Sequence, residues 1–175
     1  MKKTKTALLV IDMQKVYTAD HPWYCEGMEE VLQELPAFCL SFPKEDVFYT
    51  AFRYDEDMDG IWKEYGGRYQ TINDDPENEE IVEELKDIAH PIYCKSAYSC
   101  LSNTELMKKL QEYDEIILTG VQAEVCVLST AYGLIDLGKK VIFKRSLIAG
   151  RNKEIKEAAE RALSSMSPLH VRFID

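Results

Sequence analysis

Short, uninterrupted apolar runs alternate with segments of helical spacing along this chain, and this alternation limits the folds that it can adopt. Continuous apolar runs are typical of strands that are covered on both faces of a sheet. The sequence predicts six strands, at residues 7–12, 46–52, 91–95, 115–121, 140–144 and 170–174. Because helix-like segments separate them, the pattern indicates βαβ units, a parallel sheet and a three-layer α/β/α sandwich.

The segments between the strands carry helix signals of different kinds. Periodic apolar residues predict helices over 77–88, 124–137 and 153–166, and Gly138 is a suitable end for the second of them. Ser102 to Glu105 fits a capping box for a helix that runs to Leu110. Pro36 interrupts the apolar pattern of 31–42, which predicts a kink or two short helices there. The polar stretch 53–75 has no clear period, and we expect it to be irregular.

Length and charge narrow the classes of partner. The chain has 175 residues, which suits one domain over 1–175. It carries 21 Lys and Arg against 31 Asp and Glu, a net charge of −10. A protein that binds the phosphate backbone needs the opposite sign, so we expect neither nucleic acid nor an anionic membrane as a partner. A small-molecule substrate fits this charge better.

The cysteines and the N-terminal residues predict a cytoplasmic protein. Five cysteines without CxxC spacing are typical of reduced thiols rather than of a disulfide framework. The basic start leads into an apolar run that ends after five residues at Asp12, and no cleavage site follows. A secretory signal is therefore not expected.

Several well-known motifs are absent from the sequence. It contains no GxGxxG, GxxxxGK[ST], GxSxG or HExxH. Dinucleotide binding, P-loop phosphate binding, the serine nucleophile elbow and zincin chemistry therefore have no motif in their support.

Three residues at strand ends remain as candidates for chemistry: Asp12, Lys95 and Cys126. Ligands of open parallel sheets bind beyond the carboxyl ends of the strands. Taken singly, Asp12 could be a turn residue, Lys95 a surface residue and Cys126 a small buried one. Cys126 also opens a predicted helix, whose free N–H groups and dipole favour a thiolate and can bind an oxyanion.

Three runs together resemble the isochorismatase-like cysteine hydrolases, which include nicotinamidases and N-carbamoylsarcosine amidases. They are ALLVIDMQ at 7–14, KSAYSCLSNTEL at 95–106 and TGVQAEVCV at 119–127. The second run is similar to the family's Lys-x-x-x-Ser-x-Phe-x-x-Thr-x-Leu pattern, with Ala97 and Leu101 where bulkier residues are usual. Glu124 stands where the third run usually has Asp.

This resemblance implies a six-stranded parallel sheet in the order 3-2-1-4-5-6 and a catalytic triad of Asp12, Lys95 and Cys126. It also implies a cis peptide between Val121 and Gln122, with an oxyanion hole formed by the N–H groups of Gln122 and Cys126. The retained thiol implies hydrolysis of a small amide, ureido or imide C–N bond through an acyl-enzyme. Relatives are often oligomers, so a homo-oligomer is possible. The alternatives are a non-catalytic binding module with the same triad and a metal-dependent nicotinamidase.

The metal and substrate sites are less well defined by the resemblance. Nicotinamidases carry a D-x-H metal motif after the second strand, where this chain has no histidine, so we expect no metal and no other cofactor. The acidic residues of that stretch could hold only a hard cation; they are Asp55, Glu56, Asp57 and Asp59. Candidate substrate-binding residues, which could form an aromatic wall or pair a carboxylate, are Gln14, Tyr17, Arg53, Trp62, Tyr65 and Arg68.

Overall fold

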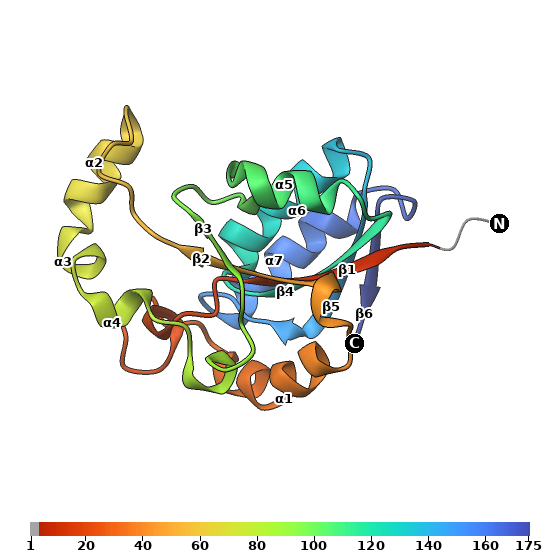
Figure 1. Cartoon of the computed structure of the whole chain (residues 1–175), viewed down its shortest axis with the longest axis horizontal. Coiled ribbons are helices and arrows are strands. Elements are labelled where there is room, and N and C mark those ends of the chain that lie inside the picture. The colour runs from red at the N-terminus through yellow and green to blue at the C-terminus, as the bar shows by residue number, and fades with distance from the viewer. Residues whose placement is uncertain (1–3) are drawn as a thin grey trace.

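A six-stranded, fully parallel sheet forms the centre of the protein (Figure 1). The computed structural model describes residues 4–175. The strand order is β3-β2-β1-β4-β5-β6, which confirms the order implied by the resemblance. The strands are β1 (Thr6–Ile11), β2 (Val47–Phe52), β3 (Ile92–Lys95), β4 (Glu115–Gly120), β5 (Lys140–Ile148) and β6 (Val171–Ile174).

Helices cover both faces of the sheet, as the apolar runs require. Along β1, Leu9 and Ile11 pack in a core with α5 (Thr104–Leu110), α6 (Leu128–Asp136) and α7 (Lys153–Ser164). Leu8 and Val10 point to the other face and pack in a core that includes α1 (Met28–Leu40). Successive residues of a strand face opposite sides, so a strand in the middle of a sandwich must be apolar throughout. The predicted α/β/α sandwich is therefore confirmed.

The segment 77–88 does not form the single helix that its apolar spacing predicts. It contains a short helix α4 (Pro76–Glu79) and a 3₁₀ turn at Glu83–Leu85. Between them the backbone bonds to the loop after β1, with Lys15 N–H donating to Glu80 O and Val82 N–H to Met13 O. These hydrogen bonds to a distant segment replace those of a local helix.

Three further local predictions need correction. The stretch 53–75 is not irregular, because α2 (Ile61–Arg68) and α3 (Gln70–Asn73) lie within it and run along one end of the sheet (Figure 1). Of the two alternatives predicted at Pro36, a kink or two short helices, the second is wrong, because α1 continues through the proline as one helix with one buried face. Asn103 caps α5 in place of Ser102, its Oδ1 accepting from Leu106 N–H at 2.9 Å.

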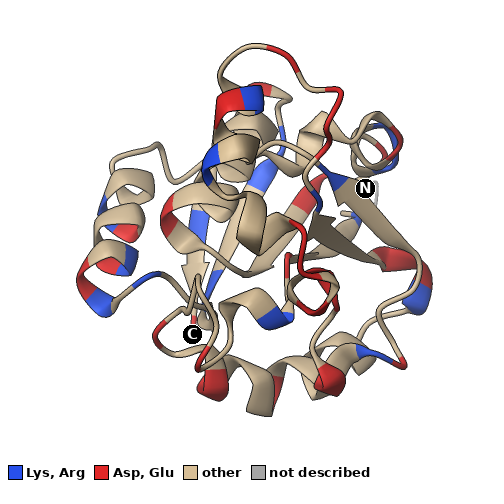
Figure 2. Cartoon of the chain, turned by 90° about the vertical axis from the view of Figure 1, so that its left-hand side faces the viewer, with Lys and Arg blue, Asp and Glu red and all other residues tan. Residues whose placement is uncertain are grey.

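Charged side chains lie mainly on the outer elements of the protein (Figure 2). Figure 2 shows acidic and basic residues intermixed on the outer helices of the side that carries α2 and α3. Within residues 4–175, no helix combines the length and the apolar character needed to cross a bilayer.

Candidate active site

Asp12, Lys95 and Cys126 come from three separate strand ends and meet in the interior. Asp12 directly follows β1, Lys95 is the last residue of β3, and Cys126 lies in a π-helical turn, Ala123–Val127, between β4 and α6. All three are buried, with exposures of 0%, 3% and 4%. Burial of a carboxylate and an ammonium is costly unless the two charges are paired.

Lys95 contacts the other two side chains. Its Nζ lies 2.7 Å from Asp12 Oδ2 and donates to Cys126 Sγ at 3.4 Å. The third contact of the ammonium is Ala97 O, at 3.0 Å. The ring of Phe52 lies 5.4 Å from the same nitrogen. The ammonium thus donates to the thiol and to Ala97 O, and its ion pair with Asp12 holds it between the carboxylate and the thiol.

The charges around Cys126 act in opposite directions. Burial first, and then the charge of Asp12, raise the pKa of the Cys126 thiol well above its ordinary value, while Lys95 lowers it. Burial would lower the pKa of Lys95, but the charges of Asp12 and Cys126 outweigh it and raise that pKa. Of the two charged neighbours of the Cys126 thiol, Lys95 favours the thiolate and Asp12 opposes it.

The backbone before Cys126 has an unusual conformation. Gly120 has φ of +99°, and a Cβ at this position would lie 2.1 Å from Ile11 O. The peptide bond between Val121 and Gln122 is cis. The π-helical turn then begins, with Val127 N–H donating to Gln122 O at 3.0 Å. π-helical turns are found frequently at functional sites.

A pocket of about 110 Å³ opens directly above Cys126. Six aromatic side chains line it, together with Gln122, Val125, Cys126 and Arg151. The aromatic residues are Tyr17, Trp23, Phe52, Tyr65, Tyr69 and Tyr98. Several of the rings contact each other edge to face, such as Trp23 with Phe52 and with Tyr69. A cavity of this size accepts a molecule of about one small ring.

The structure brings only some of the candidate substrate-binding residues to this pocket. Tyr17 and Tyr65 line it. Trp62 packs on Tyr65 and Tyr98 instead, at centroid distances of 5.3 and 4.9 Å. Gln14 is buried, and its amide bonds to the N–H and C=O of Phe52. Its polar atoms therefore hold two backbone segments together.

The two arginines proposed for a substrate carboxylate also lie elsewhere. Arg53 is half exposed and lies 3.5 Å from Glu79. Arg68 stacks on the outside of Tyr69, at 5.9 Å. The arginine that lines the pocket is Arg151, whose side chain forms no ion pair with the described residues.

The sequence contained a weak signal for Arg151 and almost none for the additional aromatic residues. Arg151 follows the carboxyl end of β5, but only because β5 extends to Ile148 and not to the predicted 144. Its position is fixed by its N–H, which donates to the Glu124 carboxylate at 3.1 Å. Tyr98 lies within the lysine run, whereas Trp23 and Tyr69 belong to segments without any motif.

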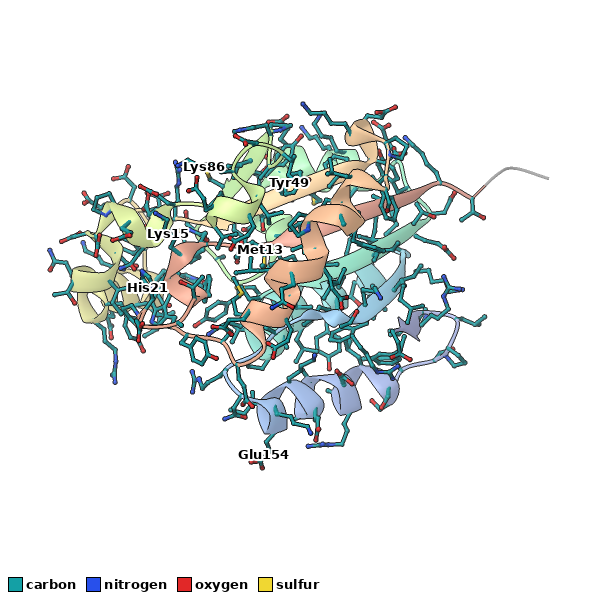
Figure 3. The ribbon with its side chains drawn as sticks, turned by 90° about the horizontal axis from the view of Figure 1, so that it is seen from below. Met13, Lys15, His21, Tyr49, Lys86 and Glu154 are labelled. Atoms are coloured by element: carbon teal, nitrogen blue, oxygen red, sulfur yellow. The ribbon has the colours of Figure 1, made fainter. Side chains whose placement is uncertain are left out.

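The residues after β2 do not fit a transition-metal site. Within residues 4–175, no three His, Cys, Asp or Glu side chains converge in a way that could hold a metal ion. Asp55 accepts from the N–H of Asp57 and so forms a local turn. His21 lies on the loop after β1, far from Glu154 at the start of α7, and contacts Thr18 (Figure 3). These donors do not provide the imidazole-rich set that Zn²⁺ prefers.

One known protein family matches almost the whole chain. The family model described as Isochorismatase domain matches residues 6–171. No match to the sequence was found among curated proteins.

Solved structures of the same fold cover almost the whole chain. Nicotinamidase PncA from Bacillus subtilis has a TM-score of 0.80 at 20% identity and covers 98% of this chain and 100% of its own. The pyrazinamidase of Pyrococcus horikoshii in complex with zinc has a TM-score of 0.75 at 21% identity, covering 98% and 99%. An isochorismatase-like hydrolase from Alkaliphilus metalliredigens has 0.72 at 22%, covering 98% and 94%. At these identities the likeness establishes the fold.

Proposed function

Because this chain belongs to the isochorismatase family, we propose that it is a hydrolase that uses Cys126 to cleave a small amide, ureido or imide C–N bond. The observation that carries the proposal is the buried contact of Lys95 with both Asp12 and Cys126 beneath the aromatic pocket. A buried nucleophile, a carboxylate and a cation in mutual contact are the groups that covalent acyl transfer requires.

The proposed reaction begins with the thiol. Asp12 accepts the proton of Cys126 as the sulfur attacks the carbonyl carbon, and the C=O π electrons move to oxygen. The N–H groups of Gln122 and Cys126 would stabilise that oxyanion. Collapse of the intermediate breaks the C–N bond, and Asp12 returns its proton to the leaving nitrogen. Water then hydrolyses the thioester to release the acid and restore the thiol.

Because the pKa of Cys126 is raised, we expect its thiol to stay protonated until it attacks the substrate. Burial disfavours the Cys126 thiolate, while Lys95 stabilises it as it forms. Proton transfer to Asp12 would therefore accompany attack. A thiol that keeps its proton until then also resists oxidation and alkylation, since those reactions need the thiolate.

The pocket indicates the class of substrate. Aromatic rings surround a cavity of about 110 Å³, which favours a compact, flat amide or ureide. Arg151 takes the place of Arg53 and Arg68 as the group that would pair a substrate carboxylate, because it lines the pocket and its guanidinium forms no ion pair with the described residues. A planar guanidinium binds a carboxylate through two parallel hydrogen bonds.

The test is a screen of small amides, ureides and carbamoyl compounds, scored by ammonia release. We expect hydrolysis by the wild type and none by Cys126→Ala, with both proteins unfolding at similar temperatures. Cys94→Ala is the matched control, because Cys94 is exposed and lies outside the pocket. A Cys126→Ala protein that retains wild-type turnover would overturn the covalent mechanism.

The same screen separates the enzyme from a non-catalytic binding module. Each compound is also tested for binding by its effect on the melting temperature. A compound that stabilises the protein without being hydrolysed, with no acyl adduct on Cys126 by mass spectrometry, would favour the binding module.

A further inference from the structure

Asp12 has a backbone conformation that few residues adopt. Its φ is +51°, in the left-handed region. Such a conformation is uncommon for residues other than glycine and persists where the surrounding structure holds it. Asp12 is also completely buried, so neither solvent nor a surface neighbour holds it. Neighbouring groups of the protein must therefore hold it.

Thr50, in the neighbouring strand β2, makes that contact with both the backbone and the side chain of Asp12. Its hydroxyl donates to Asp12 Oδ1 at 2.7 Å. The N–H of Asp12 in turn lies 3.2 Å from Thr50 O and 3.3 Å from Thr50 Oγ1. Thr50 itself is 1% exposed. One residue therefore fixes the backbone of Asp12 and one of its two carboxylate oxygens.

Cys100 orients the Thr50 hydroxyl. Its Sγ lies 3.6 Å from Thr50 Oγ1. Because the single proton of the hydroxyl goes to Asp12, the thiol of Cys100 is the donor in this pair. Burial raises the pKa of Cys100 to about 11, so that it keeps its proton at neutral pH. The chain of donors runs from Cys100 to Thr50 to Asp12.

We propose that Thr50 is a positioning residue that assigns different tasks to the two oxygens of the Asp12 carboxylate. Oδ1 is held by the Thr50 hydroxyl, which leaves Oδ2, at 2.7 Å from Lys95 Nζ, to exchange the proton with Cys126. This inference rests on the proposed function, since it assigns Thr50 a part in the proton transfer of that reaction. A fixed carboxylate matters because misplacing a reacting group by about 1 Å can lower a rate about 100-fold.

Variants of Thr50 separate positioning from simple packing. Thr50→Val keeps the shape of the side chain and removes the hydroxyl, whereas Thr50→Ser keeps the hydroxyl. The matched control is Thr119→Val in β4, because Thr119 is fully buried and its hydroxyl bonds only to a backbone carbonyl, Leu9 O, at 3.2 Å. Thr50→Ala serves as the second variant if Thr50→Val does not fold.

We expect kcat for a compound hydrolysed by the wild type to fall about 10–100-fold in Thr50→Val, with KM changed less than threefold. Thr50→Ser should stay within about threefold of the wild type. Thr119→Val should lose stability without a change in kcat. Equal losses of kcat in Thr50→Val and Thr119→Val would overturn the inference.

A measurement without substrate distinguishes this inference from the proposed function. Thiolate absorbance of Cys126, isolated by difference against Cys126→Ala, is titrated in each variant. Because the charge of Asp12 raises the pKa of Cys126, displacement of the carboxylate in Thr50→Val should shift that titration, whereas Thr50→Ser should not. A shift in a protein that hydrolyses nothing would support the positioning role and contradict the hydrolase. An unchanged titration would overturn the role of Thr50 even if the enzyme is active.

Discussion

Removal of the ammonium at Lys95 tests the buried charge cluster directly. In Lys95→Met most of the side-chain volume remains, but the carboxylate of Asp12 loses the cation 2.7 Å from its Oδ2. Both side chains of this ion pair are 0% exposed, so no water replaces the lost partner. Breaking such a pair costs about 3–5 kcal/mol in the free energy of unfolding. With a urea slope of about 2 kcal/mol/M, the unfolding midpoint should fall by about 2 M.

The reference for this loss is an exposed ion pair of the same type. Lys109 lies 4.0 Å from Glu105 on α5, with side-chain exposures of 45% and 72%. Lys109→Met should therefore cost no more than about 0.5 kcal/mol. The double variant Asp12→Asn with Lys95→Met should recover part of the stability, because the uncompensated charge is gone. If Lys95→Met unfolds at the same urea concentration as Lys109→Met, the buried pair is not present in the protein.

The same substitution changes the titration of the thiol and the pH dependence of stability. Lys95 lowers the pKa of Cys126, so Lys95→Met should raise it further, as seen in thiolate absorbance against pH. The pKa of Lys95 itself is raised in the folded state. Its contribution to the free energy of unfolding is therefore fully present below the ordinary lysine pKa of about 10.4 and is lost as the pH rises above that value. The unfolding free energy of Lys95→Met should not show this loss.

Three further predictions follow from the pocket and the sheet. Exhaustive chelation should leave activity unchanged, because the residues after β2 do not form a metal site; a loss that Zn²⁺, Fe²⁺ or Mn²⁺ restores would contradict this. Arg151→Gln should raise KM about 10–100-fold for a carboxylate-bearing substrate and leave KM unchanged for the matching uncharged amide. Equal changes of KM for both substrates would exclude carboxylate recognition by Arg151. Gly120→Ala should cost about 3 kcal/mol or more in urea unfolding, since its Cβ would lie 2.1 Å from Ile11 O, whereas Gly67→Ala on α2, with open space around it, should be neutral or stabilising.

The sheet was predictable from the sequence because burial on both faces leaves a strand no polar position. β1 is the clearest example, with Leu8, Leu9 and Val10 all at 1% exposure or less. The helix predicted at 77–88 failed for a related reason. Its apolar residues Ile81 and Val82 do face the interior, but they do so from an extended segment that bonds to the loop after β1. Spacing alone cannot distinguish these two ways of burying the same side chains.

The candidate site was predictable only where it coincided with strand ends. Asp12, Lys95 and Cys126 directly follow or end apolar runs, and each has a side chain of obvious chemistry. The residues of the pocket wall neither follow an apolar run nor carry an obviously reactive side chain. Trp23, Tyr69 and Tyr98 come from three loops or short helices, and their contacts depend on how these segments fold over the sheet. Arg151 was missed because the polar residues Lys144, Arg145 and Ser146 made the strand seem to end too early.

The register of the sheet decides whether the three candidate groups meet. Ile11 is opposite Gly120, so Asp12 and the turn that carries Cys126 leave the sheet at the same level. Phe52 is opposite Lys95, which brings the end of β3 to that level across β2. A slip of one residue in either pairing would turn the side chains of the slipped strand to the other face of the sheet and move the candidate groups apart. The apolar strands and the close approach of Gly120 to Ile11 therefore hold the three groups together as directly as the side-chain contacts do.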